Sequence, residues 1–547
     1  ERFVDPESNK SSTQASSNEL LTGDLYVDKG ERTMWDAQAF LYYQQSIAKN
    51  NINLSVGFNA TSDFTESTST HYRGFPSGEF HSSNYAAEVV DKPTKSQSQA
   101  RLFGMIASLN YTYNDIYLLD ASARFDGSSE FGSESRWGSF WSLGAGVNVH
   151  NFEFMQSLPW INQFKIRGTY GATGKVNYPP YAARDMYNIL FDDWYSTGIG
   201  ATLQGVGNEN LVWEKTNTTN LGFDLSFFKS KYNLTFSWYN RQTVDMITDV
   251  TIPSSAGFTS YKDNMGETRN RGYEISLNAM IVNHKDFGVN VFANFAHNEG
   301  KLMKISESLK AYNERVMEFY REELKNQDLY KNALANAEYA IPIPQYSEGQ
   351  SLTSIWAVRS LGIDPTTGEE LFLNRDGSIT DKWDPAQEVV VGNTEPKLNG
   401  SIGLNATYKN WSLFAAFQYE FGGQEYNQTL VNRVENADIK GGNVDLRVLT
   451  DRWQKPGDVA QFKNIANSNL TTLPTSRFVQ DKKYIRLSSV TLSYDFNREW
   501  IKKHLHMNML RFEVSSSDFI NWNSIRQERG LSYPKSWKID FSLKAQF

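Results

Sequence analysis

The sequence predicts an all-β fold, a transmembrane antiparallel β-barrel, and three features of the chain predict it. Segments of about ten residues alternate between apolar and polar side chains, as strands with one face in lipid and one in water do. The connections between these segments are alternately short and long. No run of about 18 or more apolar residues occurs, which excludes transmembrane helices.

The composition agrees with strands that have one apolar and one polar face. Aromatic residues make up 14% of the 547 residues, yet the mean hydropathy is low at −0.53. The balance of 62 acidic against 54 basic residues gives no nucleic-acid footprint and no polybasic membrane patch. The chain has no cysteine, so it has neither disulfides nor thiolate metal ligands. Because it begins at Glu1 with no signal segment, we expect a mature or shortened chain.

The last segment shows the alternation most simply. In 537–547 the odd positions carry Trp, Ile, Phe, Leu, Ala and Phe, and the even positions carry Lys, Asp, Ser, Lys and Gln. Successive side chains of a strand point to opposite faces, so one face is apolar and the other polar. We predict about fifteen such strands, near 33–43, 51–62, 100–113, 115–125, 138–150, 162–171, 214–228, 231–241, 267–282, 286–298, 397–409, 410–421, 483–496, 508–517 and 536–547.

The lengths of the connections predict the orientation. Outer-membrane barrels have short periplasmic turns and long extracellular loops. The short connections here are 49–50, 114–115, 150–163, 229–231, 283–286, 409–410 and 497–506. The long ones are 63–99, 126–137, 172–213, 242–266, 299–396, 422–482 and 518–535.

The order of these connections also predicts where the ends of the chain lie. The last strand follows a long loop, so we expect a periplasmic C-terminus, and residues 1–32 on the extracellular side. Bacterial single-chain barrels have even strand numbers, and fifteen is odd. We therefore expect the whole of 1–547 to be the C-terminal part of a larger barrel.

The longest loop, 299–396, has structure of its own. Apolar residues at spacings of three and four predict an amphipathic helix within 301–324. Gly and Asp-Gly turns in 362–380 predict a small hairpin. The helix is either a moving lid or a helix packed on the rim of the barrel. Its apolar positions are Leu302, Ile305, Leu309, Tyr312, Val316 and Phe319.

Several stretches resemble SusC-like TonB-dependent transporters, of the SusC/RagA family. They appear in that family's order and span about residues 100–547. They include "RFDGSSEFGSESRWGSFWSLGAGVNV" (124–149), "WINQFKIRGTYGATGKV" (160–176), "NENLVWEKTNTTNLGFDLSFF" (208–228), "GFTSYKDNMGETRNRGYEISL" (257–277), "GIDPTTGEELFLNRDG" (362–377), "GNTEPKLNGSIGLNATYKNWSL" (392–413), "SRFVQDKKYIRLSSVTLSYDF" (476–496) and "LSYPKSWKIDFSLKAQF" (531–547).

The resemblance implies an importer in the outer membrane of Gram-negative Bacteroidota. It implies a 22-stranded barrel with an N-terminal plug and a segment that contacts TonB. It also implies a SusD-like surface lipoprotein as a lid, in a two-plus-two assembly, and an oligosaccharide or peptide as substrate. Neither plug nor TonB-contacting segment is visible in these residues, so both are expected in an N-terminal portion. The terminal Phe547 resembles the signal read by the outer-membrane assembly machinery.

Enzyme and cofactor signals are poor, so we expect no catalysis and no cofactor. "GATGKV" at 171–176 has the wrong glycine spacing for a phosphate loop, and Val176 replaces the magnesium-binding Ser or Thr. His504 and His506 lie in a predicted turn, where solvated histidines are the simpler interpretation. "DGSSE" (126–130) and "NRDGS" (374–378) offer oxygen ligands but complete no EF-hand, and turn chemistry explains both.

An importer needs aromatic faces and hydrogen-bonding groups in its outer vestibule. Clusters of this kind occur in the long loops, where the alternative is that they hold the loops together or contact the lid. The predicted substrate-binding residues are Asp192, Asp193, Trp194, Tyr195, Trp356, Arg359, Trp383, Arg452 and Trp453, and Trp383 lies between Asp381 and Asp384.

Charged residues in the strands should face the lumen, since they are costly on the lipid face. These are Arg124, Lys165, Arg167, Glu274 and Arg486, with Lys538, Asp540 and Lys544 in the last strand. Aromatics near strand ends should form girdles at the two membrane interfaces. These are Trp35, Trp137, Trp141, Trp238, Trp411 and Trp537.

Three functions remain open from the sequence. The first is a TonB-driven importer, and the second is a passive outer-membrane pore without a plug. The third is a soluble surface β-protein, such as an adhesin or a glycan hydrolase. That protein would divide its long loops between both ends, so the one-sided pattern favours a barrel.

Overall fold

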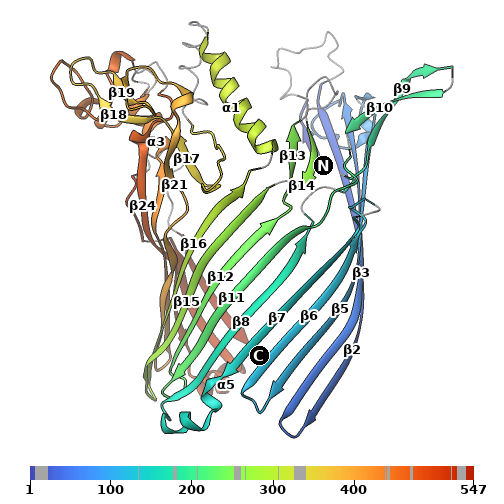
Figure 1. The fold of residues 1–547 in the computed structure, drawn as a ribbon, viewed down its shortest axis with the longest axis vertical. Helices are drawn as coiled ribbons and strands as arrows, with labels where there is room; N and C mark the ends of the chain where they lie inside the picture. Colours follow the sequence, from blue (N-terminus) through green and yellow to red (C-terminus); the bar gives the residue numbers. More distant parts are fainter. Residues whose placement is uncertain are drawn as a thin grey trace.

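The structure is a computed structural model of the chain (Figure 1). It describes the chain except for residues 7–21, 91, 133–134, 177–179, 182, 197, 206, 252–259, 265, 306, 326–340, 438, 440–443, 468–471, 519 and 527–537.

One antiparallel sheet of 18 strands forms the body of the molecule. Every predicted segment coincides with one of its long strands, so the predicted all-β fold is confirmed. The long strands are β2 (Asp24–Ile47), β3 (Asn50–Arg73), β5 (Thr94–Tyr113), β6 (Tyr117–Ser128), β7 (Trp137–Asn148), β8 (Ile161–Lys175), β11 (Glu214–Phe227), β12 (Tyr232–Val244), β15 (Glu267–Asn283), β16 (Phe287–Lys304), β22 (Leu398–Tyr408), β23 (Trp411–Tyr426), β24 (Val479–Asp495), β25 (Met509–Ser517) and β27 (Lys538–Gln546).

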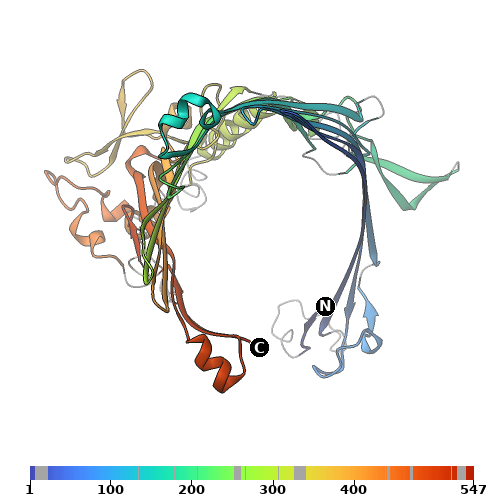
Figure 2. The ribbon, with the colours of Figure 1, turned by 90° about the horizontal axis from the view of Figure 1, so that it is seen from below.

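The sheet curves into a barrel wall whose two edges are not paired with each other (Figure 2). Each long strand pairs with the next one along the chain, from β2 to β27. In the described part, β27 pairs only with β25, and the outer edge of β2 pairs only with β1 (Arg2–Val4) at its upper end. Two further short strands, β4 (Glu88–Val89) and β26 (Asn521–Asn523), complete the sheet.

The register gives the sheet one apolar and one polar face. In β11 and β12, Leu221 lies opposite Trp238 and Phe223 opposite Phe236, whereas Asp224 lies opposite Thr235 on the other face. Directly paired residues share a face. When this pairing is followed from strand to strand, all eight charged residues predicted to face the lumen lie on the polar face.

The register also places five of the six predicted girdle tryptophans on the apolar face, and the sixth, Trp537, lies outside the described residues. In β27 the apolar side chains are strongly exposed, with Phe541 at 71%.

The polar face lines the inside of the curve. In β7 the positions on this face, such as Gly138, Phe140 and Gly144, are buried, and the alternate positions, such as Trp141 and Leu143, are exposed. Side chains on the concave side of a curved sheet are crowded together and buried, whereas those on the convex side are spread apart and exposed. The lipid-type surface therefore points outward, as membrane barrels require.

Short turns lie at one end of the barrel and long loops at the other, as predicted (Figure 1). Between β5 and β6, Asn114 and Asp115 have φ of 53° and 55°, the left-handed pair that a tight hairpin needs. Between β24 and β25 lies α5 (Arg498–Leu505), whose N-cap Asn497 accepts hydrogen bonds from the backbone N–H groups of Glu499 and Trp500. The turn between β7 and β8 holds the 3-10 helices η3 (Val149–Asn151) and η4 (Glu153–Ser157).

The long loops carry the remaining elements. These are η2 (Ser83–Tyr85), β9 (Met186–Tyr195), β10 (Gly198–Gly205), β13 (Ile247–Thr251), β14 (Ser260–Asn264), α1 (Glu307–Lys325), β17 (Ser354–Ala357), β18 (Arg359–Ile363), β19 (Glu370–Leu373), β20 (Ile379–Thr380), η7 (Pro385–Gln387), β21 (Val389–Asn393), α3 (Gln428–Leu430), η8 (Val431–Glu435), α4 (Arg447–Thr450), η9 (Ile465–Asn467) and η10 (Ser476–Phe478).

The predicted helix within 301–324 begins later than expected. Leu302 lies in β16 opposite Thr268, and α1 starts only at Glu307. The backbone of 301–304 is committed to the ladder with β15, so it is not free to form a helix. The predicted hairpin at 362–380 is present as β18 and β19, with β20 added as a third strand.

None of the helices in the described part of the chain is long and apolar enough to cross a membrane.

Candidate functional site

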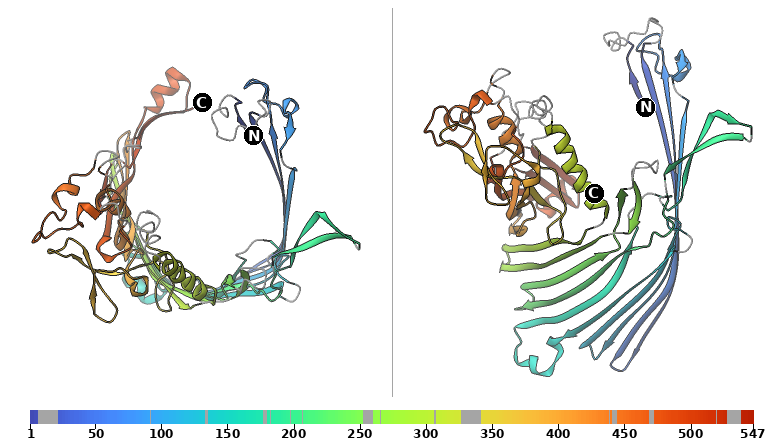
Figure 3. Two further views of the ribbon diagram at one scale, coloured as in Figure 1. Left: turned by 90° about the horizontal axis from the view of Figure 1, so that it is seen from above. Right: turned by 45° about the horizontal axis from the view of Figure 1, so that its top comes forward.

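The described residues of two long loops, 305–397 and 427–478, join into one body at the mouth of the barrel, which we call the loop assembly. Backbone hydrogen bonds run between the loops, from Val358 N–H to Pro474 O at 3.2 Å and from Ser476 N–H to Val358 O at 2.9 Å. Viewed along the barrel axis, the β18–β19 hairpin and the described part of 427–478 project outward beyond the wall, and α1 lies close to the wall (Figures 2 and 3). It is therefore a fixed rim structure and not a pair of independent loops.

Apolar side chains give the loop assembly its own core. One cluster joins the helical segments after β23 to the segment before β24, and a second joins α1 to the small sheets. The buried members of the first are Leu430, Val431, Val434, Ala437, Val448, Phe462 and Phe478. Those of the second are Val316, Val358, Phe372, Trp383 and Leu473.

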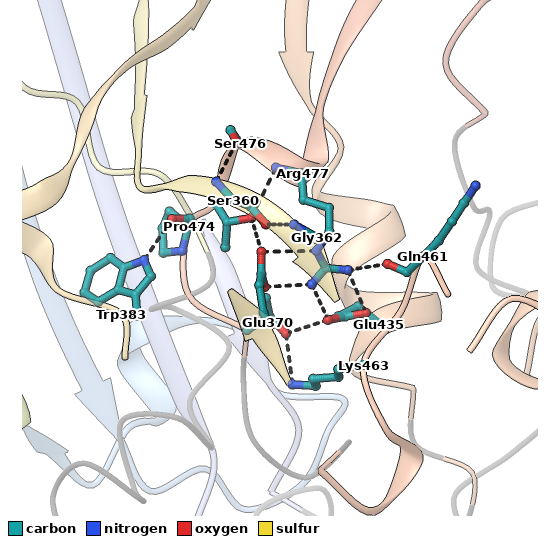
Figure 4. A network of polar contacts seen from close by, with 12 residues as sticks. Ser360, Gly362, Glu370, Trp383, Glu435, Gln461, Lys463, Pro474, Ser476 and Arg477 are labelled. Atoms are coloured by element: carbon teal, nitrogen blue, oxygen red, sulfur yellow. Dashed lines mark hydrogen bonds and ion pairs between the residues drawn. The ribbon is translucent and has the colours of Figure 1, made fainter. Parts of the chain in front are cut away.

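A buried ionic network locks this core (Figure 4). The Arg477 guanidinium donates to Glu370 at 2.8 and 3.1 Å and to Glu435 at 2.6 and 3.3 Å. It also donates to Gln461 O at 2.6 Å, so every N–H donor of the guanidinium has a partner. The side chains of Arg477, Glu370 and Glu435 are 11%, 8% and 0% exposed. One cation thus joins carboxylates from two separate loops.

The charges of this network shift one another. Burial favours the neutral acid of Glu435, but the charge and hydrogen bonds of Arg477, with the charges of Lys463 and Arg452, outweigh burial and hold its pKa below its ordinary value. Burial lowers the pKa of Lys463 to about 8, and its Nζ donates to Thr472 Oγ1 at 2.9 Å. Glu435 is therefore ionised at neutral pH, and Lys463 is still mostly protonated.

A second buried carboxyl group lies beside α1, at the start of β21. Glu388 accepts a hydrogen bond from the Gln345 amide, and its backbone oxygen accepts one from Arg375. Burial raises the pKa of Glu388 to about 8, so the group is mostly protonated at neutral pH.

Five of the nine predicted substrate-binding residues lie in the loop assembly, and three of them are buried there. Trp383 Nε1 donates to Pro474 O at 2.9 Å, and Trp453 Nε1 donates to Pro365 O at 2.9 Å. Arg452 is 4% exposed and donates to backbone oxygens that include Lys463 O at 2.8 Å. The Trp453 ring packs on Gly368, where a Cβ would clash with the ring. The φ of +75° at this position also favours glycine. In this geometry these side chains hold the loops together and present no free face to a solute.

The other predicted residues are dispersed. Trp356 is half-buried in β17, and Arg359 is exposed in β18. Asp192, Asp193, Trp194 and Tyr195 end β9, and their side chains lie outside the described residues. The β9–β10 hairpin points away from the barrel wall on the opposite side from the loop assembly (Figures 2 and 3). The structure does not bring the predicted clusters together into one vestibule.

Polar hollows instead line the inner wall. One of about 400 Å³ lies where β15 and β16 meet the loop assembly, and another of about 260 Å³ lies lower on the same strands. Their linings include Asn270, Thr353, Glu274 and Asn294. Sequence reasoning missed these groups as a site, because single Ser, Thr and Asn residues on a polar strand face carry no distinguishing signal. A larger hollow of about 900 Å³ lies on the apolar outward face, which suits lipid and not a polar solute.

The metal candidates from the sequence have other partners. Asp126, in the 126–130 stretch, is bound by Arg124 at 2.6 Å, and His504 Nδ1 contacts Trp500 O at 2.9 Å. Asp376 closes its own turn onto Ser378. Among the described residues, no group of three His, Cys, Asp or Glu side chains is placed to hold a metal ion.

Comparisons with known proteins agree on the family. Residues 5–515 match the family model described as TonB dependent receptor-like, beta-barrel. The TonB-dependent receptor P39 of Formosa agariphila is 26% identical over 489 residues, which are 82% of this chain and 46% of that protein. The TonB-dependent receptor SusC of Bacteroides thetaiotaomicron is 25% identical over 485 residues, 84% of this chain and 44% of that protein. The chain thus spans about half the length of these relatives.

Solved structures agree on the fold. The RagAB peptide transporter matches with a TM-score of 0.76 at 21% identity, over 92% of this chain and 53% of that one. The RagAB peptide importer in the 'open-open' state matches with a TM-score of 0.79 at 20% identity, over 96% of this chain and 56% of that one. Because the family model covers most of the chain and the open sheet has the matching fold, this chain belongs to the TonB dependent receptor-like β-barrel family.

Proposed function

We propose that the complete protein imports a polar nutrient, an oligosaccharide or a peptide, across the outer membrane and that TonB drives the import. The observation that carries this proposal is the two-faced sheet, apolar outside and polar inside, in a chain that matches a TonB-dependent receptor family over residues 5–515. An outward apolar face needs lipid, and an inward polar face suits a hydrated solute.

The unpaired edges of the sheet support a barrel completed by an N-terminal portion. Among the described residues, the edge of β2 below its β1 pairing and the outer edge of β27 have no strand partner, and lipid cannot satisfy their backbone groups. In the proposal, upstream strands bring the total to the expected 22 and close the ring. The plug and the TonB-contacting segment lie in the same N-terminal portion, so this chain supplies the wall and the rim.

The loop assembly supports a partner at the mouth. Its apolar cores and the Arg477 network make a stable platform, onto which a SusD-like surface lipoprotein would close as a lid. We propose the two-plus-two assembly, in the outer membrane of a Bacteroidota bacterium, with the long loops extracellular and the C-terminus periplasmic. The protein would have no catalytic role, and the energy for import would come through TonB.

Both substrate classes stay open. The likeness to the RagAB structures, at 20–21% identity, bears on the fold and not on the cargo. Of the residues predicted to bind substrate, half-buried Trp356 and exposed Arg359 are the best placed among those whose side chains are described.

Growth on single carbon sources tests the proposal. Strains that lack this protein, the proposed lid lipoprotein or TonB would be grown on a panel of oligosaccharides and peptides. We expect at least one source to support the parent strain and none of the three mutants. Uptake that needs this protein but persists without TonB would identify the alternative, a passive pore.

A further inference from the structure

We propose that the solute moves along one strip of the inner wall, formed by β12, β15, β16 and β22, which we call the polar strip. This inference rests on the proposed import function and adds to it the route and the class of solute. Two observations support it. Two hollows lie one above the other on this strip, and loops cover the wall elsewhere, at the upper end of β6 to β8.

The upper hollow, of about 400 Å³, opens at the foot of the loop assembly. The inner face of the barrel contributes Thr268, Asn270 and Gly300, and the covering segments are 351–353 and 394–396. These segments are fixed to the wall, because Gly300 N–H donates to Glu395 Oε2 at 3.0 Å and Leu302 N–H donates to Gln350 O at 2.9 Å. The hollow is therefore a built feature of the rim.

The lower hollow, of about 260 Å³, lies on the same two strands. Thr235, Ser237, Glu274, Ser276 and Asn294 project into it from the inner face. Six residues along β15 separate Asn270 from Ser276, which is about 20 Å at the rise of an antiparallel strand.

Polar groups also fill the stretch between the two hollows. The Tyr239 hydroxyl donates to Asn298 Oδ1 at 2.9 Å, and Asn298 also contacts Glu395 of the upper hollow. Below the lower hollow, Phe292 and Phe414 stack on the inner face with ring centroids 6.1 Å apart. A solute moving down the strip thus meets hydroxyl and amide groups first, and an aromatic pair near the lower end.

The wall across β6 to β8 is closed at its upper end. Phe140 points inward from β7 and is buried under Phe131, Leu211 and Trp213 from the long loops. Trp213 is only 5% exposed, and its Nε1 donates to Arg136 O at 3.3 Å. An apolar seal of this kind offers a hydrated solute neither space nor hydrogen bonds.

The lining defines the class of solute. Hydroxyls and amides dominate both hollows, and their charged side chains are Glu274, Lys301 and Glu395. The Glu395 carboxylate is engaged by Asn298 and the Gly300 backbone. The Arg167 guanidinium donates to Ser237 of the lower hollow at 2.7 Å, so both signs of charge are present along the strip. The polar strip therefore suits a chain rich in hydroxyl or amide groups.

Cysteine labelling of the full-length protein, together with its lipoprotein partner in cells, tests this route. The present chain has no cysteine, so introduced thiols are unambiguous within it. Ser276→Cys places a thiol on the polar strip, and the matched Ser122→Cys places one on the inner face of β6. The probe is a membrane-impermeant methanethiosulfonate with a trimethylammonium group.

We expect Ser276→Cys to be labelled in energised cells and to lose labelling when TonB is removed, while Ser122→Cys stays unlabelled in both.

Two results would separate failure of the route from failure of import. If Ser122→Cys labels as fast as Ser276→Cys, or faster, in a TonB-dependent way, the protein imports but the polar strip is not its route. If both positions label at the same rate with and without TonB, the protein is an open pore. Both the proposed route and the proposed import function would then be wrong.

Discussion

Replacing Arg477 by methionine should loosen the loop assembly while the barrel stays intact. The change keeps a long apolar stem and removes the guanidinium that bridges Glu370 and Glu435. Both carboxylates lie in the core, at 8% and 0% exposure. Removing one partner of a buried ion pair costs about 3–5 kcal/mol, because the remaining charge is left without compensation.

Hydrogen exchange of the full-length protein in detergent measures this cost locally. The amides to follow are those of Asn427, which donates to Phe478 O at 2.8 Å, and of Ser476, which donates to Val358 O. At about 1.4 kcal/mol per factor of ten, protection of these amides should fall between about a hundredfold and a few thousandfold. The matched control is Arg271→Met, which breaks the exposed pair with Glu299 and should leave these amides unchanged.

The loss should depend on pH in a stated direction. In the parent protein the pKa of Glu435 is held low, so its stabilising contribution is present above the ordinary glutamate pKa and is lost as pH falls through the lowered value. Without Arg477, burial is opposed only by the charges of Lys463 and Arg452, so the pKa of Glu435 should rise and the variant should regain protection as the pH is lowered. If Arg477→Met lowers protection by less than about tenfold, and by no more than Arg271→Met does, the network does not hold the loops together.

The remaining predictions concern the two faces, a buried acid, a helix cap and the chain end. Leu221→Arg, on the outward face, should lower the free energy of unfolding by about 2–4 kcal/mol and reduce the heat-modifiable folded band on gels. The adjacent Asn220→Arg, on the inward face, should fold normally. Equal defects in the two variants would contradict the assigned faces. Glu388 has a folded pKa of about 8, so protection near it should fall as pH rises from about 4.5 to about 8, and Glu388→Gln should abolish that slope; an unchanged slope would contradict the burial argument. Asn497→Ala should lower the local stability of α5 by about 1 kcal/mol in hydrogen exchange, and no change would mean that the cap is not needed. Removing Phe547 should reduce the amount of barrel assembled in the membrane, and normal assembly would refute its role as a signal.

The barrel could be predicted from the sequence because its signal is local and repeated. The alternation in 537–547 gives the two faces of β27, and the short and long connections give the common end of the loops. Leu302 was assigned to the wrong element because its spacing fits a helix, whereas pairing with Thr268 from another strand decides its structure. Pairing partners are not visible in a single segment.

The rim could not be predicted, because its residues act through contacts far apart in the chain. The sequence left two interpretations for Trp383 and Trp453, substrate binding or holding the loops together. Their indole N–H groups donate to Pro474 O and Pro365 O, about 90 residues away, and these contacts hold the loops together. Arg477 gives no local sign that it joins two loops, and the Ser and Asn residues of the polar strip resemble any other polar strand positions. Only the fold brings these groups together.

The central claim is that this chain is the wall and rim of a plugged, TonB-driven barrel. Mass mapping of every peptide in the gently solubilised complex tests it most directly. The account predicts an upstream segment with a plug, a TonB-contacting sequence and enough further strands to close the ring, together with a lid lipoprotein. Recovery of this chain with only the strands needed to close a barrel, and with neither plug nor lid, would make it an open pore and contradict the account.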